Sequence, residues 1–478
     1  DLHSFPTRRS SDLDLLERLL PILKENYKQL LPNLIETVLT LIKLRPQMAI
    51  SSSPTEEFDM NKILKDDDED DDKIKGKEIQ TTETEDLASS LSLLNTIITS
   101  IGDDFLQYVD KVEIEIVDLI TYKADSKVRT KSSKILPNLV LPMKQEQKIQ
   151  KAKYYLTLLV SAIEKETINH VCEKLFVHLK EVIENAGQFL NVNELNELFD
   201  KIAGFFENLK IKRNKLLSNT KTKKPKHNDD DEDDENISDL LDEEIEELEN
   251  VQSEISDNIG ILLKTHKNIS SGIVQKIINN IIPTYSKSSN MFEVKMGLYI
   301  ADDLIEFIGQ DMLGDANWSL MYNIISQLVT NKDVSIRQAA AYGIGNFAKF
   351  TTRNFDNYSK GLIDSLYNAM NIPKDEDDDD EKEDNEEYNS FGMSYDNMVS
   401  AIGKIINYQF NSKVVQEGLT ELMNKWIMNL PIKYDDTEKE QQHEWLVDLF
   451  LRNRQLIGEN CYSHYFETLV KIYEMNGD

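Results

Sequence analysis

Residues 333–350 read DVSIRQAAAYGIGNFAKF, and their apolar positions recur with the period of an α-helix. Ile336, Ala340, Ile344 and Phe347 fall on one face, while Asp333 precedes the run and predicts an N-terminal cap. Small residues on that face predict close contact with a neighbouring helix. A second apolar stripe follows at four-residue intervals after a short connection: Tyr358, Leu362, Leu366 and Met370. The segment is therefore predicted to form a pair of helices.

The same pattern recurs along the chain in units of mostly 30 to 50 residues. Two helices per roughly 40 to 47 residues is the period of HEAT repeats, which become stable by stacking on their neighbours. The predicted fold is all-α, a HEAT-repeat α-solenoid in which about nine antiparallel helix pairs form a right-handed superhelical array. The predicted pairs are Asp14–Leu44, Thr84–Lys123, Ser126–Glu164, Thr167–Leu217, Asp239–Ser286, Ser288–Lys332, Asp333–Asn371, Ser390–Leu430 and Tyr434–Met475.

Composition supports this reading. The 478 residues include only 17 Gly and 11 Pro, which disfavours turn-rich β folds and glycine-fingerprint nucleotide folds. Two distant cysteines, Cys172 and Cys461, cannot build a disulfide framework or a CxxC zinc site, so a reducing compartment is expected. No apolar run is long enough to span a membrane, and no signal peptide opens the chain, so an intracellular protein is expected.

The formal net charge of −32 comes mainly from three acidic runs: residues 66–72, 229–249 and 375–387, which hold 32 acids. The rest of the chain is nearly neutral. Like charges without apolar residues predict disordered loops. The expected organisation is a cloning scar at 1–13, helix pairs at 14–217 with an acidic loop at 66–72, a basic-then-acidic loop at 218–237, helix pairs at 238–371, an acidic loop at 372–389, and helix pairs at 390–478.

Two motifs that could carry chemistry are interpreted as structural. The GxGxxA match at 343–348 lies inside a predicted helix, so it lacks the strand-turn-helix geometry that binds phosphate. His170, Cys172 and His178 point in different directions on one helix and cannot converge on a metal ion. We therefore predict no catalytic, metal or cofactor site, and no enzyme activity.

Residues 210–226 are basic and end in Lys-Lys-Pro-Lys, which suggests a nuclear localisation signal or a nucleic-acid patch. The acids at 229–235 follow at once and would compete for these lysines. A pairing within the chain is at least as plausible, and direct DNA or RNA binding is not expected.

Several acids on predicted helices are candidate contacts for a basic peptide. Each alone is more simply a solvated side chain, since exposed ion pairs contribute about 0 to 1 kcal/mol. Stacked repeats can align such acids along a groove, where their combined field attracts a Lys/Arg-rich segment. The candidates are Asp302, Asp303, Glu306, Asp396, Glu444 and Asp448.

Two pairs share an acid four positions before a base at a helix start: Asp125 with Arg129, and Asp333 with Arg337. They are either ordinary i,i+4 pairs or, as in HEAT arrays, bonds between neighbouring repeats. Both readings are structural.

Four segments resemble, in the same order, the importin-5 or importin beta-3 class of β-karyopherins: GLYIADDLIE at 297–306, VSIRQAAAYGIG at 334–345, NMVSAIGK at 397–404 and WIMNLPI at 426–432. The resemblance is good from about residue 288 to 430 and weaker upstream. By this comparison the chain is the carboxyl-terminal half of a nuclear transport receptor.

The resemblance implies that the protein binds basic cargo and phenylalanine-glycine nucleoporins, shuttles between cytoplasm and nucleus through the nuclear pore, and does not insert into membranes. RanGTP, which releases cargo in the nucleus, would bind mainly through missing amino-terminal repeats. The alternative is a general HEAT-repeat scaffold subunit, of the phosphatase or coat-complex type, without transport activity.

Overall fold

The computed structural model describes residues 13, 15–20, 22, 29–44, 82–222, 232–373 and 389–475. Side chains at 82, 219–222 and 232–239 are outside the description. The predicted scar at 1–13, apart from Leu13, lies outside the described residues, as do the acidic run at 66–72, the Lys-Lys-Pro-Lys segment and the acidic run at 375–387.

The described residues contain helices and turns but no strand, and the prediction of an all-α HEAT-repeat solenoid is confirmed. From Thr84 onward, every predicted pair contains described helices on both sides of a turn. The α-helices are α2 (Leu31–Lys43), α4 (Thr82–Ile101), α5 (Val109–Ile116), α6 (Ser126–Val140), α7 (Gln145–Ile163), α8 (Asn169–Ala186), α9 (Val192–Thr222), α10 (Glu232–Thr265), α11 (Ser271–Lys276), α12 (Ile282–Tyr285), α13 (Met291–Asp303), α14 (Gly309–Leu328), α15 (Val334–Phe350), α16 (Asp356–Met370), α17 (Ser390–Tyr408), α18 (Lys413–Glu417), α19 (Leu419–Met428), α20 (Asp436–Asn453) and α21 (Tyr462–Met475).

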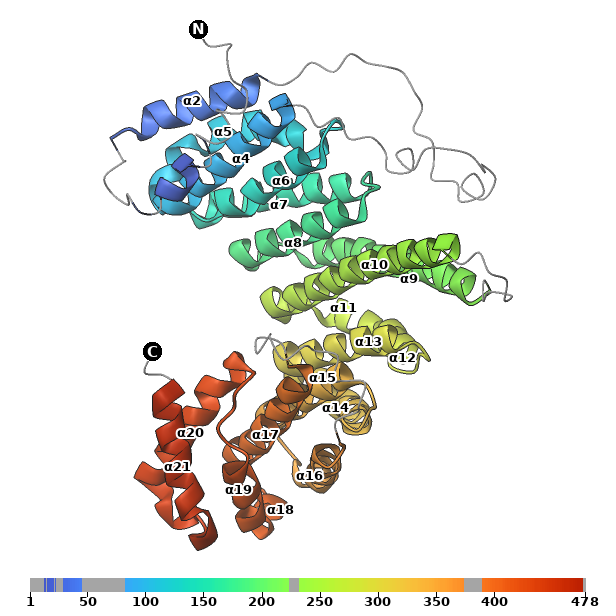
Figure 1. The fold of residues 1–478 in the computed structure, drawn as a ribbon, viewed down its shortest axis with the longest axis vertical. Helices are drawn as coiled ribbons and strands as arrows, with labels where there is room; N and C mark the ends of the chain where they lie inside the picture. The colour runs from blue at the N-terminus through green and yellow to red at the C-terminus, as the bar shows by residue number, and fades with distance from the viewer. Residues whose placement is uncertain are drawn as a thin grey trace. The chain divides into compact units, whose positions relative to one another are not determined.

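The helices form two compact units. Unit 1 comprises residues up to Leu190 together with Leu209–Asn258, and unit 2 comprises Asn191–Asn208 and Ile259–Asp478. In unit 1, α2 packs on α4, α4 on α6, and α6 on α8, while α7 packs against α6 and α8 (Figure 1). Alternate helices along the chain are therefore neighbours, which is the arrangement of stacked helix pairs.

Unit 2 repeats this scheme. Helices α13, α15 and α17 pack side by side as one layer, and α14 packs with α16, and α16 with α18, as the other (Figure 1). Two π-helical turns interrupt this unit, Ile277–Ile281 between α11 and α12, and Leu304–Ile308 directly after α13. A π-turn inserts one extra residue into a helix and is often found at functional sites.

Helix α15 forms as its sequence predicts. The Asp333 carboxylate accepts hydrogen bonds from the backbone N–H groups of Ser335 (2.9 Å) and Ile336 (3.1 Å), which caps the helix. Gly343 and Gly345 lie in its interior, where an added Cβ would overlap side chains of α13 and α17 respectively. The GxGxxA motif is therefore a helix-packing surface, as interpreted from the sequence.

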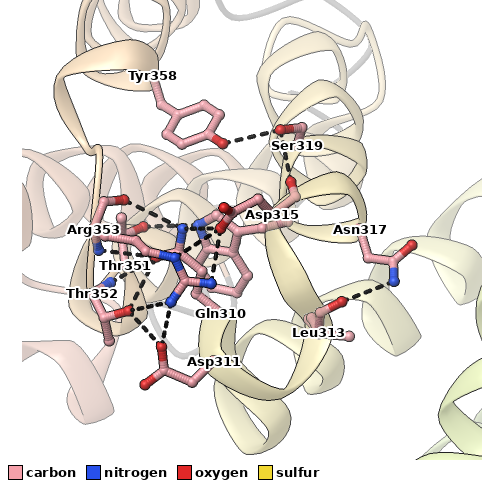
Figure 2. A network of polar contacts seen from close by, with 11 residues as sticks. Gln310, Asp311, Leu313, Asp315, Asn317, Ser319, Thr351, Thr352, Arg353 and Tyr358 are labelled. Atoms are coloured by element: carbon pink, nitrogen blue, oxygen red, sulfur yellow. Dashed lines mark hydrogen bonds and ion pairs between the residues drawn. The ribbon is translucent and has the colours of Figure 1, made fainter.

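A network of polar contacts joins the start of α14 to the loop between α15 and α16 (Figure 2). The buried side chain of Gln310 accepts hydrogen bonds from the backbone N–H groups of Thr352 (2.8 Å) and Arg353 (3.1 Å). The Arg353 guanidinium contacts Asp311 (2.6 Å) and Asp315 (2.9 Å). Gln310 thus ties the loop after α15 to the start of α14 through two backbone hydrogen bonds.

The loop predicted at 218–237 differs from the structure at both ends, because α9 continues to Thr222 and α10 begins at Glu232. Next to these ends, basic α9 lies against acidic α10. Lys212 Nζ is 3.1 Å from Glu244, and the buried Arg213 donates to Gln252 at 3.1 Å. Leu216, Ile245 and Leu248 form an apolar cluster between them. Part of the basic stretch is therefore paired within the chain.

No helix among the described residues has both the length and the apolar character that crossing a bilayer requires.

Candidate functional site

Three of the predicted acids lie together in unit 2. Asp302 and Asp303 end α13, and Glu306 lies in the π-helical turn that follows. We call these three residues the acidic triad. Asp302 is buried, with only 5% of its surface exposed, whereas Asp303 and Glu306 are partly exposed. Sequence reasoning placed all three on one helix but gave no sign that Asp302 is interior.

Glycines on neighbouring helices make room for two of these carboxyl groups. A Cβ atom added to Gly343 of α15 would overlap Asp302 Oδ1, and one added to Gly260 of α10 would overlap Asp303 Oδ2. The same added Cβ at Gly343 would lie 3.0 Å from the Ile325 side chain of α14. The carboxyl group of Asp302 thus packs against helix backbone where any other residue would place a side chain.

Glu306 receives two hydrogen bonds from α15. Tyr342 and Asn346 of α15 both donate to Glu306 Oε2, at 2.7 Å and 3.0 Å. Asp302 Oδ1 is buried and has no hydrogen-bond partner among the described residues. Burial, followed by the negative charges of Asp303 and Glu306, raises the pKa of Asp302 well above its ordinary value. Burial and the bond to Glu306 also raise the pKa of Tyr342.

Asp396 of α17 has a different environment. It is also buried, at 6% exposure, but its Oδ2 accepts hydrogen bonds from three successive backbone N–H groups, those of Lys433 (2.9 Å), Tyr434 (2.6 Å) and Asp435 (3.3 Å). Burial raises the pKa of Asp396, and the backbone bonds oppose that rise. Asp396 therefore fastens the segment before α20 to α17, and it exposes little surface to a binding partner.

Further along α17, Lys404 and Glu438 of α20 form a buried ion pair at 2.6 Å. Ser400 also donates to Glu438, and Gln442 donates to Ser400 at 3.1 Å. We call this set, together with Asp396 and its backbone donors, the paired seam. No sequence signal marked Lys404 or Glu438, because their partnership links residues 34 positions apart.

The last two predicted acids lie on α20 and do not join the triad in one cluster. Glu444 is exposed, and Asp448 forms an exposed pair with Arg452 at 3.3 Å. An exposed pair of this kind contributes little to stability and leaves Asp448 accessible.

The four acid-base ladder residues have structural contacts. Asp125 caps α6 by accepting from the Val128 N–H at 3.0 Å, as Asp333 caps α15. Arg129 donates to Glu166, before the next helix pair, at 2.8 Å. Arg337 donates to the backbone oxygens of Asn331 and Lys332 at 2.9 Å and 2.7 Å.

The histidine and cysteine residues of α8 do not form a metal site. His178 is buried, shares a hydrogen bond with Ser133 Oγ at 2.9 Å, and burial lowers its pKa to about 3. Burial raises the pKa of Cys172 to about 12, so its thiol is unreactive. Within the described residues, no three His, Cys, Asp or Glu side chains are placed to hold a metal ion.

Comparison with known proteins fits this geometry. No protein-family model matches the chain. Importin subunit beta-3 of Saccharomyces cerevisiae is 24% identical over 451 residues, an alignment that covers 92% of this chain and 38% of the relative. The chain is therefore similar to this importin subunit along most of its own length.

Solved β-karyopherin structures share the fold. The crystal structure of Kap121p bound to Nup53p superposes with a TM-score of 0.66 at 18% identity, over 97% of this chain and 40% of that one. Kap121p bound to the extreme C-terminus of the protein phosphatase Cdc14p gives 0.64 at 18% identity, over 97% and 39%. A Kap121p mutant gives 0.68 at 18% identity, over 99% and 42%. The chain thus spans about two fifths of the length of the relatives that it matches.

Proposed function

We propose that this chain is part of a nuclear import receptor that binds basic segments of cargo proteins and phenylalanine-glycine segments of nucleoporins. The observation that carries the proposal is the match to importin subunit beta-3 across 92% of the chain, together with a solenoid of the same fold. Binding and release of macromolecules, without catalysis, is the activity proposed. Such a receptor shuttles between cytoplasm and nucleus.

The acidic triad is the strongest candidate on the chain for contact with basic cargo. Asp303 and Glu306 keep part of their surface exposed, and Asp302 adds a third carboxyl group beside them. Glu444 and Asp448 offer a second, more exposed group of acids on α20. The net charge of −32 favours fast capture of cationic segments at low salt.

Nucleoporin contact and Ran regulation belong to the same proposal. Burying one phenylalanine side chain stabilises a complex by about 1.5 to 3 kcal/mol, which gives the weak and rapidly reversible contacts that passage through a pore needs. RanGTP would act mainly through repeats that precede this segment in the longer relatives. This chain alone is therefore expected to bind cargo without complete release by RanGTP.

A binding assay with an arginine-rich peptide and a phenylalanine-glycine repeat peptide tests the proposal. We expect the chain to bind both peptides. We expect the affinity for the arginine-rich peptide, but not for the phenylalanine-glycine peptide, to fall markedly when salt rises from low to physiological strength. Failure to bind either peptide at any salt would leave the scaffold alternative and reject the receptor.

A variant pair locates the cargo contact. The double substitution Asp303→Asn with Glu306→Gln should lower the affinity for the arginine-rich peptide, because it removes the partly exposed charges of the triad. Asp118→Asn in unit 1 removes one exposed carboxylate elsewhere and is the matched control. If both variants bound the arginine-rich peptide with equal affinity, the triad would not be part of the cargo-binding site.

A further inference from the structure

Helices α20 and α21 of unit 2 share an exposed apolar face. Helix α20 turns Glu438 and Gln442 toward α17, to which both are hydrogen-bonded, and α21 packs on α19 (Figure 1). On the other side of the two helices, five large apolar side chains are between 42% and 79% exposed. They are Val447 and Leu451 on α20, and Phe466, Val470 and Tyr473 on α21. We call these five residues the outward face.

The outward face is continuous across the two helices. Val447 and Leu451 are four positions apart, and the three residues of α21 follow one another at intervals of four and three. Each set therefore forms one stripe along its helix. The Phe450 ring of α20 meets the Phe466 ring edge to face, with 5.6 Å between the ring centroids. The two stripes therefore belong to one apolar surface.

The size of the outward face is that of a small protein interface. At these exposures the five side chains offer on the order of 500 Å² of surface, which is close to what each partner contributes to a weak specific complex. Apolar patches of this size on soluble proteins mark interaction sites. The occupant must itself be apolar at its centre, so a basic peptide does not fit.

Charges on α20 are arranged about the centre of this face. The exposed positions along its outer side are, in order, Glu440, Glu444, Val447, Leu451 and, directly after the helix, Arg454. This side is therefore acidic at its start, apolar in its middle and basic at its end. No hydrogen bond or ion pair engages the side chains of Glu444 and Arg454 within the described part of the chain.

We propose that the outward face binds the same face of a second copy of this chain, with the two α20 helices antiparallel about a twofold axis. Val447 then lies opposite the partner's Leu451, and Glu444 lies opposite the partner's Arg454, because both pairs are centred on position 449. The twofold axis makes each contact occur twice. A helix that is acidic at one end and basic at the other is complementary to itself only in this antiparallel arrangement.

This pairing is separate from the proposed cargo contact. It uses an apolar face of α20 and α21, whereas the acidic triad lies at the end of α13. In the paired state Glu444 contacts the partner's Arg454, so it is withdrawn from cargo and the triad remains. A helix pair of another protein would also fit two apolar stripes, but it would not require charges that mirror each other about the centre of α20.

Light scattering after size-exclusion chromatography of the whole chain tests the proposal. At high protein concentration we expect a mass approaching twice the 55.2 kDa of one chain, which falls to that of one chain on dilution. Leu451→Glu should give the mass of one chain throughout. Ile114→Glu in unit 1 is the matched control, because Ile114 is also 72% exposed, and it should leave the dimer intact. Circular dichroism should show the same helix content in both variants.

Charge reversal tests the register. Glu444→Arg and Arg454→Glu should each raise the dissociation constant of the dimer by about tenfold, because two contacts per dimer become repulsive. The double variant should restore the wild-type constant. Failure of the double variant to bind more tightly than the single variants would overturn the antiparallel pairing.

Two further outcomes would overturn the inference. A wild-type chain that has the mass of one copy at every concentration would leave the outward face to another partner. A dimer that survives Leu451→Glu would place the contact elsewhere on the chain. Neither outcome involves a basic or phenylalanine-glycine peptide, so both would leave the proposed function intact.

Discussion

The acidic triad and the paired seam both bury acids in unit 2, but the two differ in the groups that compensate the buried carboxyl groups. Asp302 and Asp396 are almost equally buried, at 5% and 6% exposure. Asp396 accepts three backbone N–H groups, and nearby Lys404 neutralises Glu438. Asp302 lies near the charges of Asp303 and Glu306, and its Oδ1 has no hydrogen-bond donor among the described residues. Two acids with almost equal burial can therefore differ completely in the hydrogen bonds that compensate them.

This difference has a consequence for stability. Groups of the paired seam should be costly to remove, because each loss strands a buried partner. Replacing the Asp302 carboxyl group by a neutral group should increase the free energy of unfolding, because no hydrogen bond to its Oδ1 would be lost. Four substitutions, from the largest expected effect to the smallest, test this contrast.

Lys404→Met is expected to have the largest effect. It leaves Glu438 buried without its counter-charge, which should lower the free energy of unfolding of unit 2 by about 3 to 5 kcal/mol. Urea denaturation followed by circular dichroism measures the change. The double variant Lys404→Met with Glu438→Leu should recover most of the loss; an equal loss in both would show that the ion pair is not the cause.

Asp396→Ala should come next. It removes the acceptor for three backbone N–H groups near Tyr434, and the free energy of unfolding should fall by about 3 kcal/mol. Asp396→Asn keeps an oxygen acceptor and is the matched control, with a smaller loss. If Asp396→Ala and Asp396→Asn had the same free energy of unfolding, the hydrogen bonds to Asp396 would not be what holds the segment before α20 against α17.

Gly343→Ala should destabilise the triad region by about 2 kcal/mol, since the new methyl group overlaps the Asp302 carboxyl group and approaches Ile325. The melting temperature of the variant measures the effect. Gly204→Ala, where an added Cβ meets nothing within 4 Å, is the control and should have no such cost. A Gly343→Ala variant with the wild-type melting temperature would mean that α13 and α15 can move apart at little energetic cost.

Asp302→Asn should have the smallest effect and the opposite sign. At pH 7 it should raise the free energy of unfolding by on the order of 1 kcal/mol, because a neutral amide replaces an acid whose pKa is raised well above its ordinary value by burial and by the charges of Asp303 and Glu306. Asp396→Asn makes the same chemical change in the paired seam and should destabilise.

The gain from Asp302→Asn should depend on pH. The folded pKa of Asp302 lies above the unfolded value of about 3.9, so between these values the folded chain binds more protons than the unfolded chain. Wild-type stability contributed by this group is therefore full below about pH 4 and declines as pH rises. The advantage of the variant should be near zero at pH 4 and grow toward pH 7; a constant advantage would point to packing.

The helix pairs could be predicted from sequence because their signal is local. The stripe of 333–350 gave α15 with its cap at Asp333, and the structure has α15 at Val334–Phe350. The π-turn at Leu304–Ile308 could not be predicted, since one extra residue barely disturbs an apolar stripe. The helical ends of α9 and α10 were also missed, because a run of like charges was taken to prevent helix formation there.

The site was only partly predictable for a different reason. Asp302, Asp303 and Glu306 were recognised as one group because they are close in sequence. The burial of Asp302 depends on Gly343, 41 positions later, and the role of Asp396 depends on backbone groups 37 to 39 positions later. Such contacts leave no periodic trace, so acids with opposite roles look alike in the sequence.

Infrared spectroscopy of the free protein at pH 7 tests the central claim most directly, because a protonated carboxyl group has a C=O stretching band that a carboxylate lacks. The account predicts such a band in the wild type and in Asp396→Asn, and its absence in Asp302→Asn. A wild-type spectrum without this band, or a band that Asp302→Asn retains, would contradict the claim that burial without a donor to Oδ1 keeps Asp302 protonated in the free protein.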